Sequence, residues 1–296
     1  MNTSTPTTDF DRADQRNTSP TTTTFERTTQ QNTSPSTTTF DRTNQQKWSD
    51  LLTQAVTEPG LILKAYSAFY GYSIGNQLAA MLQCQLRGIE PGPIDTYKGW
   101  LEKNRQVRKG EKAIWLCMPL TRKKRDEETG EEEQFITCFV WKPLWFVLSQ
   151  TEGEPVQLPE TPEWSAERAL AALNIQQIPF TLTNGNVQGY ARKSEVAVSP
   201  VAALFHKTLF HETAHVVLAH TLESEISDSD HTPKSLREVE AEAVAFILCE
   251  SLNLPGSEYC RGYIQNWLDG DVIPEKSAQK IFGAADRILK AGQIQN

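Results

Sequence analysis

The chain has 296 residues, of which 22% are charged, and a formal net charge of −8. This length suffices for about two domains and a tail, and the acidic total excludes a protein that is basic throughout. No apolar stretch reaches the length of a membrane span and the N-terminus is polar, so we expect a soluble, cytoplasmic protein with no signal peptide and no membrane partner. The five cysteines form no C-x-x-C pair, which predicts reduced thiols in the core and no disulfide framework.

Residues 1–46 contain a unit that occurs three times, starting at Asn2, Asn17 and Asn32. Each copy has one phenylalanine followed by Asp or Glu and then Arg, within Thr, Ser, Asn, Gln and Pro. One aromatic side chain per copy cannot offset the entropy of ordering the unit, so we predict a disordered tail. The repeats could be a duplicated spacer, or three copies of an F-[DE]-R motif that docks an unknown protein with added avidity.

Residues 47–150 predict an α+β domain. Helical periodicity is present at residues 48–56, 73–87 and 96–104, and alternation begins at residue 111. A charged turn centred on Thr129-Gly130 joins this strand to a returning strand at 135–141, which makes a hairpin. The basic run at residues 122–125 faces Glu131, Glu132 and Glu133 across this hairpin, so we interpret it as a set of cross-strand ion pairs.

A second basic cluster is the candidate DNA-binding surface. Residues 47–150 hold 14 Lys and Arg against 12 Asp and Glu, a net charge of +2, whereas residues 151–296 hold 11 against 20, a net charge of −9. Cations that follow phosphates, together with rings that stack on bases, are typical of sequence-tolerant binding to single strands. The pattern alone is weak, because Tyr and Trp at helical spacing also occur in cores. The candidate residues are Trp100, Arg105, Arg108, Lys109 and Lys112.

Residues 151–163 predict an acidic, Pro-rich and Gly-rich linker, and residues 164–296 predict a mainly helical domain with a small sheet. A helix at 164–173 precedes a meander of strands at 180–183, 187–191 and 196–198. A long helix is predicted to start at Ser199-Pro200, and further helices at 236–248, 257–268 and 274–290. Tyr259 and Tyr263 lie one turn apart, where packing and stabilisation of an oxyanion are both open to them.

The helix after Ser199 contains the motif H-E-x-x-H, written here by His211, Glu212 and His215. Its i, i+4 spacing places both imidazoles on one helix face, where they can bind the same Zn²⁺. Glu212 lies about 100° away around the helix, beside the metal, where a general base for a zinc-bound water belongs.

A zinc hydrolase needs a third protein ligand. The metzincin spacing fails here, because His220 comes five residues after His215 with no glycine between them. On a continued helix His220 would point about 140° away from His215, so we interpret it as a histidine at the helix end. In the helix at 236–248, Glu240 is the carboxylate in the middle of the apolar face, and we predict it as the third ligand.

Together these parts resemble a known pair of domains. Four short segments resemble the N-terminal domain of the ArdC-type antirestriction proteins: YSIGN (residues 72–76), TYxxW (96–100), VRKGEK (107–112) and FVLSQTEG (146–153). Residues 164–296 are similar to zincin-like metallopeptidases related to ImmA/IrrE, whose H-E-x-x-H and E-x-E-A motifs are matched by residues 211–215 and 238–241. The resemblance implies a plasmid- or phage-associated protein that binds single-stranded DNA.

Three hypotheses follow. In the first, a single-stranded DNA-binding antirestriction protein carries a zinc metallopeptidase-like domain, and DNA binding is its function. In the second, the chain is an active zinc endopeptidase that cleaves a regulatory or restriction protein and is recruited by its N-terminal domain. In the third, zinc only stabilises the fold. Whether the chain is an enzyme is therefore open at this point.

Overall fold

The computed structural model describes residues 46–125, 132–157, 161–182, 187–221, 233–268 and 271–294. The predicted repeat tail and the turn at Thr129-Gly130 lie outside these residues, so those predictions are untested. The described chain is α+β, as predicted. None of its helices is long and apolar enough to cross a membrane.

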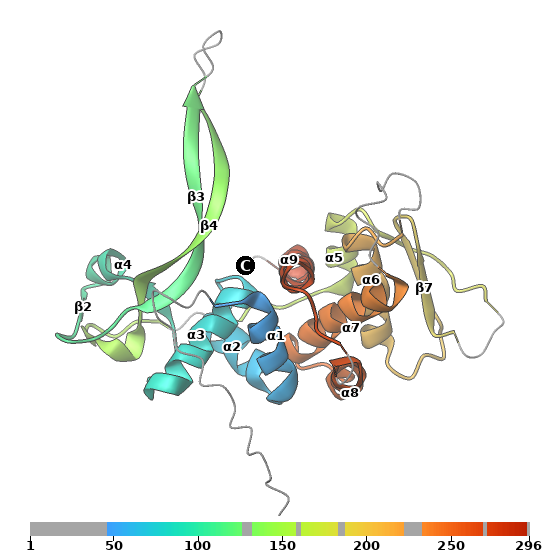
Figure 1. Ribbon diagram of the computed structural model, residues 1–296, viewed down its shortest axis with the longest axis horizontal. Helices are drawn as coiled ribbons and strands as arrows, with labels where there is room; N and C mark the ends of the chain where they lie inside the picture. Colours follow the sequence, from blue (N-terminus) through green and yellow to red (C-terminus); the bar gives the residue numbers. More distant parts are fainter. Residues whose placement is uncertain are drawn as a thin grey trace, which may run out of the picture. The chain divides into compact units, whose positions relative to one another are not determined.

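Three helices open the described chain (Figure 1): α1 (Trp48–Thr57), α2 (Leu61–Phe69) and α3 (Ile74–Arg87). The first and third were predicted from their apolar periodicity, whereas α2 was not. Gly60 and Gly88 adopt positive φ values of 77° and 62°, a backbone conformation that glycine reaches without a steric penalty. Gly60 precedes α2, and Gly88 ends α3 with its N–H donating to the last carbonyls of that helix.

A small antiparallel sheet follows, with strand order β1-β4-β3. Its strands are β1 (Ile94–Thr96), β3 (Ile114–Arg125) and β4 (Glu132–Val147). A short helix, α4 (Tyr97–Glu102), and the pair β2 (Arg105–Val107) and β5 (Thr151–Gly153) flank it, and a 3₁₀ turn, η1 (Leu148–Gln150), joins β4 to β5. The register places Lys124 opposite Glu133 and Arg125 opposite Glu132, in the arrangement predicted for the hairpin.

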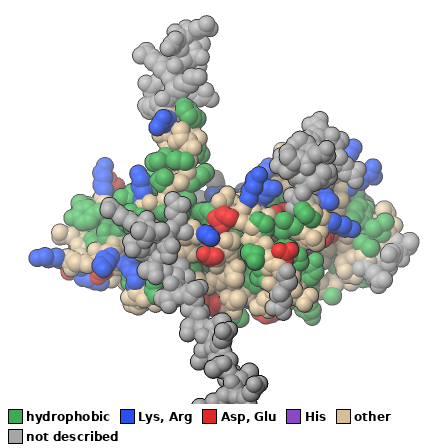
Figure 2. Space-filling view, in the orientation of Figure 1, with side chains coloured by type: hydrophobic (Ala, Val, Ile, Leu, Met, Phe, Trp, Pro, Cys, Tyr) green, Lys and Arg blue, Asp and Glu red, His purple; other side chains and the backbone are tan. Residues whose placement is uncertain are grey.

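The outer part of the β3–β4 hairpin is a two-stranded ribbon with hydrophobic side chains on its surface. Phe135, Ile136 and Phe139 are 44%, 56% and 65% exposed. Figure 2 shows hydrophobic side chains along this ribbon. The inner part is covered, because Trp141 stacks against Trp48 of α1 with ring centroids 5.4 Å apart.

The C-terminal elements begin with α5 (Ala166–Ala172), which Ser165 caps by accepting a hydrogen bond from Arg168 N. A three-stranded sheet follows, with order β6-β8-β7, made of β6 (Gln176–Gln177), β7 (Gly189–Arg192) and β8 (Glu195–Val198). The first strand of the predicted meander therefore lies at 176–177 and not at 180–183, and it pairs parallel with β8. The remaining helices are α6 (Phe205–Val217), α7 (Lys234–Ser251), α8 (Ser257–Leu268) and α9 (Glu275–Gly292).

The predicted start of the metal-binding helix at Ser199-Pro200 was wrong. Ser199 instead opens a turn, in which its carbonyl accepts a hydrogen bond from Ala202 N at 3.0 Å, and α6 begins at Phe205. The side chain of Ser199 does act as an acceptor for the following backbone, from Val201 N at 3.4 Å. The capping residue type was therefore found, but it caps a turn that precedes the helix.

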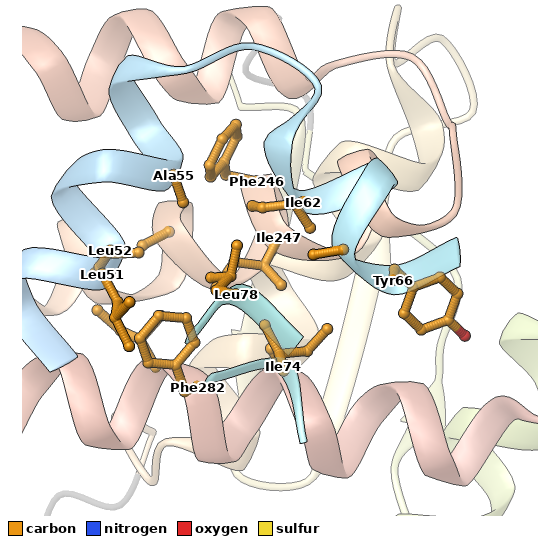
Figure 3. Packing of buried hydrophobic residues seen from close by; sticks show 14 of the residues in the cluster. Leu51, Leu52, Ala55, Ile62, Tyr66, Ile74, Leu78, Phe246, Ile247 and Phe282 are labelled. Atoms are coloured by element: carbon orange, nitrogen blue, oxygen red, sulfur yellow. The ribbon is translucent and has the colours of Figure 1, made fainter. Parts of the chain in front are cut away.

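Helix α7 is the centre of the core, and every residue from Val239 to Ser251 is buried. Helices α6, α8, α9 and α2 all pack against it. Figure 3 shows side chains from α1 and α2, such as Leu52 and Ile62, packed together with Phe246 and Ile247 of α7. The helices on both sides of the predicted linker therefore share one hydrophobic core.

Candidate metal centre

The H-E-x-x-H helix, α6, packs between the β7–β8 sheet and α7 (Figure 1). Its sheet-facing residues, Leu209 among them, join Val196 and Val198 in a small apolar cluster. This packing turns the opposite side of α6, which carries His211 and His215, toward the start of α7. The orientation of the two imidazoles thus follows from burial of the apolar side chains around them.

Three ligand atoms converge at this place. The Nε2 atoms of His211 and His215 lie 3.1 Å apart, and Glu238 Oε2 of α7 lies 3.5 Å from the first and 3.6 Å from the second. Within the described part of the chain, these three residues form a group whose ligand atoms all lie within 4.8 Å of one another. The side chains of His211, His215 and Glu238 are 18%, 14% and 37% exposed, so the group is open to solvent on one side.

The separations fit a tetrahedral divalent cation. A metal–ligand distance of about 2.0–2.1 Å and a tetrahedral angle place two ligand atoms about 3.4 Å apart. The three observed distances, between 3.1 and 3.6 Å, bracket this value. With three protein ligands, a fourth position stays open for water or a substrate, as in catalytic zinc sites.

Each imidazole also has a partner at its outer nitrogen. Glu242 Oε2 lies 2.8 Å from Nδ1 of His211, and Lys207 Nζ lies 2.9 Å from Glu242 Oε1. Burial raises the pKa of Glu242, but the hydrogen bond with His211 and the charge of Lys207 outweigh it, and the pKa falls to about 2. Glu242 is therefore ionised and accepts the Nδ1 proton of His211. Burial lowers the pKa of His211, but its hydrogen bonds with Glu238 and Glu242 raise it to about 9, so a metal bound at Nε2 would displace a proton from this imidazole.

Glu240, predicted as the third ligand, lies outside the group of converging atoms. Its carboxylate is fully buried and meets His220, with Oε2 2.9 Å from Nε2. Glu238 and Glu242, which the sequence analysis did not choose as ligands, are the carboxylates that face α6. The prediction assumed one apolar face, but α7 is covered on nearly all sides, so burial does not tell which side meets the histidines.

The interpretation of His220 as a histidine that points away from His215 was also wrong. Helix α6 ends at Val217, and Ala219 adopts a left-handed conformation with φ of 60°. The chain then turns back, with His220 N donating to His215 O at 2.8 Å, and the two Nδ1 atoms lie 3.1 Å apart. An angle calculated for a continuing helix fails because the helix stops before His220.

Glu212, the predicted general base, is 8% exposed and lies against β7. A Cβ atom added at Gly189 would come within 3.0 Å of Glu212 Cγ, so only glycine lets the strand approach α6 this closely. Burial raises the pKa of Glu212, and the nearby charges of His211 and His215 lower it by less. A carboxylate whose pKa is raised toward neutrality is suited to exchange protons near pH 7.

Tyr263 of α8 also belongs to this neighbourhood. Burial and the charges of Glu238 and Glu242 raise its pKa, which places its hydroxyl in the field of the two carboxylates. Tyr263 is 47% exposed and Tyr259 is 73% exposed, so neither side chain is part of the buried core.

The structure separates the five predicted DNA-binding residues into two groups. Trp100 is 1% exposed and donates from Nε1 to Phe146 O at 2.8 Å, so it cannot stack on a base. Arg105 is engaged with the β5 segment, including Thr151 Oγ1 at 2.8 Å. Arg108, Lys109 and Lys112 are exposed, but the guanidinium of Arg108 also pairs with Glu111 Oε1 at 2.9 Å and donates to Ser149 O at 2.5 Å.

Sequence reasoning missed Glu238 and Glu242, although a signal for them was present. They are four residues apart on α7, the spacing that separates His211 and His215 on α6. Two helices that each carry a polar pair at i, i+4 can bring both pairs into one layer. This matched spacing favours Glu238 and Glu242 over Glu240, which lies on a different side of α7.

Comparisons with known proteins fit part of this picture. Residues 22–140 match the family described as the N-terminal domain of anti-restriction factor ArdC. A protein of Sinorhizobium fredii (strain NBRC 101917 / NGR234), named Uncharacterized protein y4eC, is 28% identical over 262 residues, which are 81% of this chain and 80% of the relative. The match over residues 22–140 supports a relation to ArdC-type antirestriction proteins.

Two crystal structures of the antirestriction protein ArdC from plasmid R388 also align with the chain. The metal-free structure is 24% identical, with a TM-score of 0.48, and the alignment covers 82% of this chain and 94% of that one. The Mn(II)-bound structure is 20% identical, with the same TM-score and coverages of 82% and 97%.

Proposed function

We propose that the chain is an antirestriction protein of the ArdC type that binds single-stranded DNA with its N-terminal half and a divalent metal ion between α6 and α7. The match over residues 22–140 supports the first part. The observation that carries the second part is the convergence of His211 Nε2, His215 Nε2 and Glu238 Oε2. Glu238 takes the place that we first assigned to Glu240.

The donor set fits Zn²⁺, and it also accepts Mn²⁺. Two imidazole nitrogens and one carboxylate oxygen are a common set for zinc in hydrolases, whereas affinity for Mn²⁺ is lower in the usual order of divalent metals. A bound divalent cation would supply the Lewis acidity that activates water and polarises a carbonyl. Glu212 would accept the proton that the water loses, and it would donate that proton to the leaving group.

The proposed DNA surface consists of Arg108, Lys109 and Lys112 together with Tyr97 and Lys103 of the neighbouring α4 segment. Tyr97 is 46% exposed and replaces the buried Trp100 as the ring available for stacking on a base. Figure 2 shows Lys and Arg side chains gathered over the region of α4 and β2. Cations for phosphates and an exposed ring for bases are what binding to single strands requires.

The DNA half is tested on the full chain, because the two halves share one core and a cut near residue 150 would expose it. Fluorescence anisotropy of a labelled oligothymidylate compares the wild type with Lys109→Glu/Lys112→Glu over a series of salt concentrations. The matched control is Lys276→Glu/Lys290→Glu, which makes the same charge change on exposed residues of α9.

We expect the first double variant to bind at least about tenfold more weakly, with a salt slope reduced by about 1.4 for two lost phosphate contacts. The control should bind like the wild type. Equal weakening of both double variants, or no binding by the wild type, would show that this surface is not the DNA site.

A second candidate function, endoproteolysis, is supported by the position of β7. This strand pairs with β8 on one side and is the edge of its sheet in the order β6-β8-β7. Gly189 of β7 lies beside Glu212, so a peptide added to this edge would pass close to the general base. The substrate of such a reaction would be an extended segment of a regulatory or restriction protein.

Glu212→Gln separates the two functions. It removes the general base and keeps the metal ligands and the DNA surface, so we expect unchanged affinity for the oligonucleotide and loss of any proteolysis. Protection of incoming DNA in cells is then the deciding measurement. Protection that survives in Glu212→Gln favours DNA binding as the function, whereas loss of protection favours the peptidase.

A further inference from the structure

Behind His215, on the side away from the converging ligand atoms, lies a buried row of three side chains. His215 Nδ1 is 3.1 Å from His220 Nδ1, and His220 Nε2 is 2.9 Å from Glu240 Oε2. The side chain of His220 is 7% exposed and that of Glu240 is fully buried. The row therefore connects the outer nitrogen of a candidate ligand to a carboxylate in the protein interior.

The positions of the protons in this row follow from the chemistry of its ends. A metal ligand must present a lone pair at Nε2, so the proton of a neutral His215 is on Nδ1. The contact between the two Nδ1 atoms needs one donor and one acceptor, so His220 accepts there. The proton of a neutral His220 is then on Nε2, where Glu240 accepts it. No other arrangement of neutral imidazoles satisfies both contacts and leaves His215 Nε2 free.

We propose that His220 and Glu240 are positioning residues of the metal centre, which hold His215 in the Nδ1–H tautomer so that its Nε2 faces the cation. This inference rests on the metal centre proposed above. It explains why Glu240 is buried beside a histidine and not beside the converging ligand atoms. It also gives both ligand histidines a carboxylate from α7, directly through Glu242 for His211 and through one imidazole for His215.

The backbone keeps His220 in the required place. Its N–H donates to His215 O at 2.8 Å, and Arg237 Nη1 donates to its carbonyl at 3.4 Å. Glu240, the acceptor at the end of the row, is fully buried in α7, so both ends of the row are held by packed helices.

The alternative is that His220 and Glu240 only anchor the turn after α6. Glu240→Gln distinguishes the two roles with almost no change of volume. Its amide oxygen can still accept the Nε2 proton of His220, but it is uncharged and its amino group can donate there instead, so the Nδ1–H tautomer of His215 is no longer enforced. Substitution of an outer partner of a histidine ligand typically weakens metal binding 10- to 100-fold.

The experiment measures the affinity of the full chain for Zn²⁺ by competition with a chelating dye. It compares the wild type with Glu240→Gln, with Glu238→Gln, and with Ser251→Ala as a control for a buried change in α7. In parallel, ¹⁵N-labelled histidines of the Zn²⁺-loaded wild type report by NMR which ring nitrogen carries each proton. An anchoring role would not determine these protonation sites.

We expect Glu240→Gln to weaken Zn²⁺ binding about 10- to 100-fold, Glu238→Gln to weaken it more, and Ser251→Ala to leave it unchanged. The NMR spectra should show His215 protonated at Nδ1 and His220 protonated at Nε2. Unchanged affinity in Glu240→Gln, or a proton on Nδ1 of His220, would overturn the positioning role of His220 and Glu240 and leave the metal centre in place.

Two further results would also change the assignment of the metal ligands or of the metal centre itself. If Glu240→Gln lost more affinity than Glu238→Gln, Glu240 would be a direct ligand and the positioning role would be wrong. If the wild type bound no Zn²⁺ and no Mn²⁺, the metal centre itself would be overturned, and with it the positioning role of His220 and Glu240.

Discussion

Arg261 joins the two halves of the chain, and we expect its removal to destabilise the fold. Its guanidinium, 6% exposed, donates to Ala55 O at 3.2 Å and Val56 O at 2.6 Å at the end of α1. It also pairs with Glu250 Oε2 of α7 at 3.2 Å, and Glu250 accepts in turn from Gly60 N. We expect Arg261→Met to keep the side-chain volume and remove the charge and all three contacts.

The size of the effect follows from what is left behind. Without Arg261, Glu250 is a buried carboxylate with no cation beside it, and removal of one partner from such a pair typically costs 3–5 kcal/mol. Glu250 can instead take up a proton. From an ordinary pKa of 4.5 this costs about 3 kcal/mol at pH 7 and less than about 1 kcal/mol at pH 5. We therefore expect a loss of about 3–4 kcal/mol at pH 7 that becomes smaller at pH 5.

The assay is urea unfolding of the full chain at both pH values, followed by tryptophan fluorescence and by circular dichroism. Because α1, α2, α7 and α9 share one core, the two signals should change together. The double variant Glu250→Gln/Arg261→Met serves as the control, and we expect it to lose at least about 1 kcal/mol less than Arg261→Met at pH 7. A loss below about 1 kcal/mol, or one that does not depend on pH, would refute the reasoning.

Three other predictions concern single positions. Burial raises the pKa of Asp286 to about 6 from 3.8, so the folded chain loses stability as pH rises from about 4 to about 6. Asp286→Asn should remove this loss and stabilise the chain by up to about 3 kcal/mol at pH 7, measured by urea unfolding. In Gly189→Ala the new methyl group would lie 2.7 Å from Thr208 Cγ2. We expect this clash to lower the free energy of unfolding by about 1–3 kcal/mol and to weaken Zn²⁺ binding. Unchanged Zn²⁺ binding would contradict the close approach of β7 to α6. Trp100→Phe should lower the free energy of unfolding by about 1–3 kcal/mol, because Phe146 O loses its buried donor. Its affinity for the oligonucleotide should be unchanged. Weaker DNA binding by the folded variant would indicate that Trp100 does contact DNA.

The parts of the fold that sequence reasoning found are those fixed by local interactions. Helices α1, α3 and α5, together with the pairing of strands β3 and β4, follow from periodicity, capping and alternation among residues that lie close together in the chain. The two histidines of H-E-x-x-H share a face because the helix geometry itself requires it. Helix α2 was missed because its nine residues are mostly apolar, which weakens the periodic signal.

The remaining errors share a different cause, which is packing between distant segments. Glu240 was chosen as a ligand because it lies on an apolar face, but four helices pack on α7 and nearly all its sides are buried. Trp100 was chosen as a base-stacking ring, but β4 covers it and accepts its N–H.

The most direct test of the proposed centre is a crystal structure of the full chain with Zn²⁺, measured at the zinc absorption edge. We predict one strong anomalous peak about 2.0–2.2 Å from His211 Nε2, His215 Nε2 and a carboxylate oxygen of Glu238, with His220 and Glu240 behind His215. A peak coordinated by Glu240 in place of Glu238, or zinc bound elsewhere with none between α6 and α7, would contradict the account.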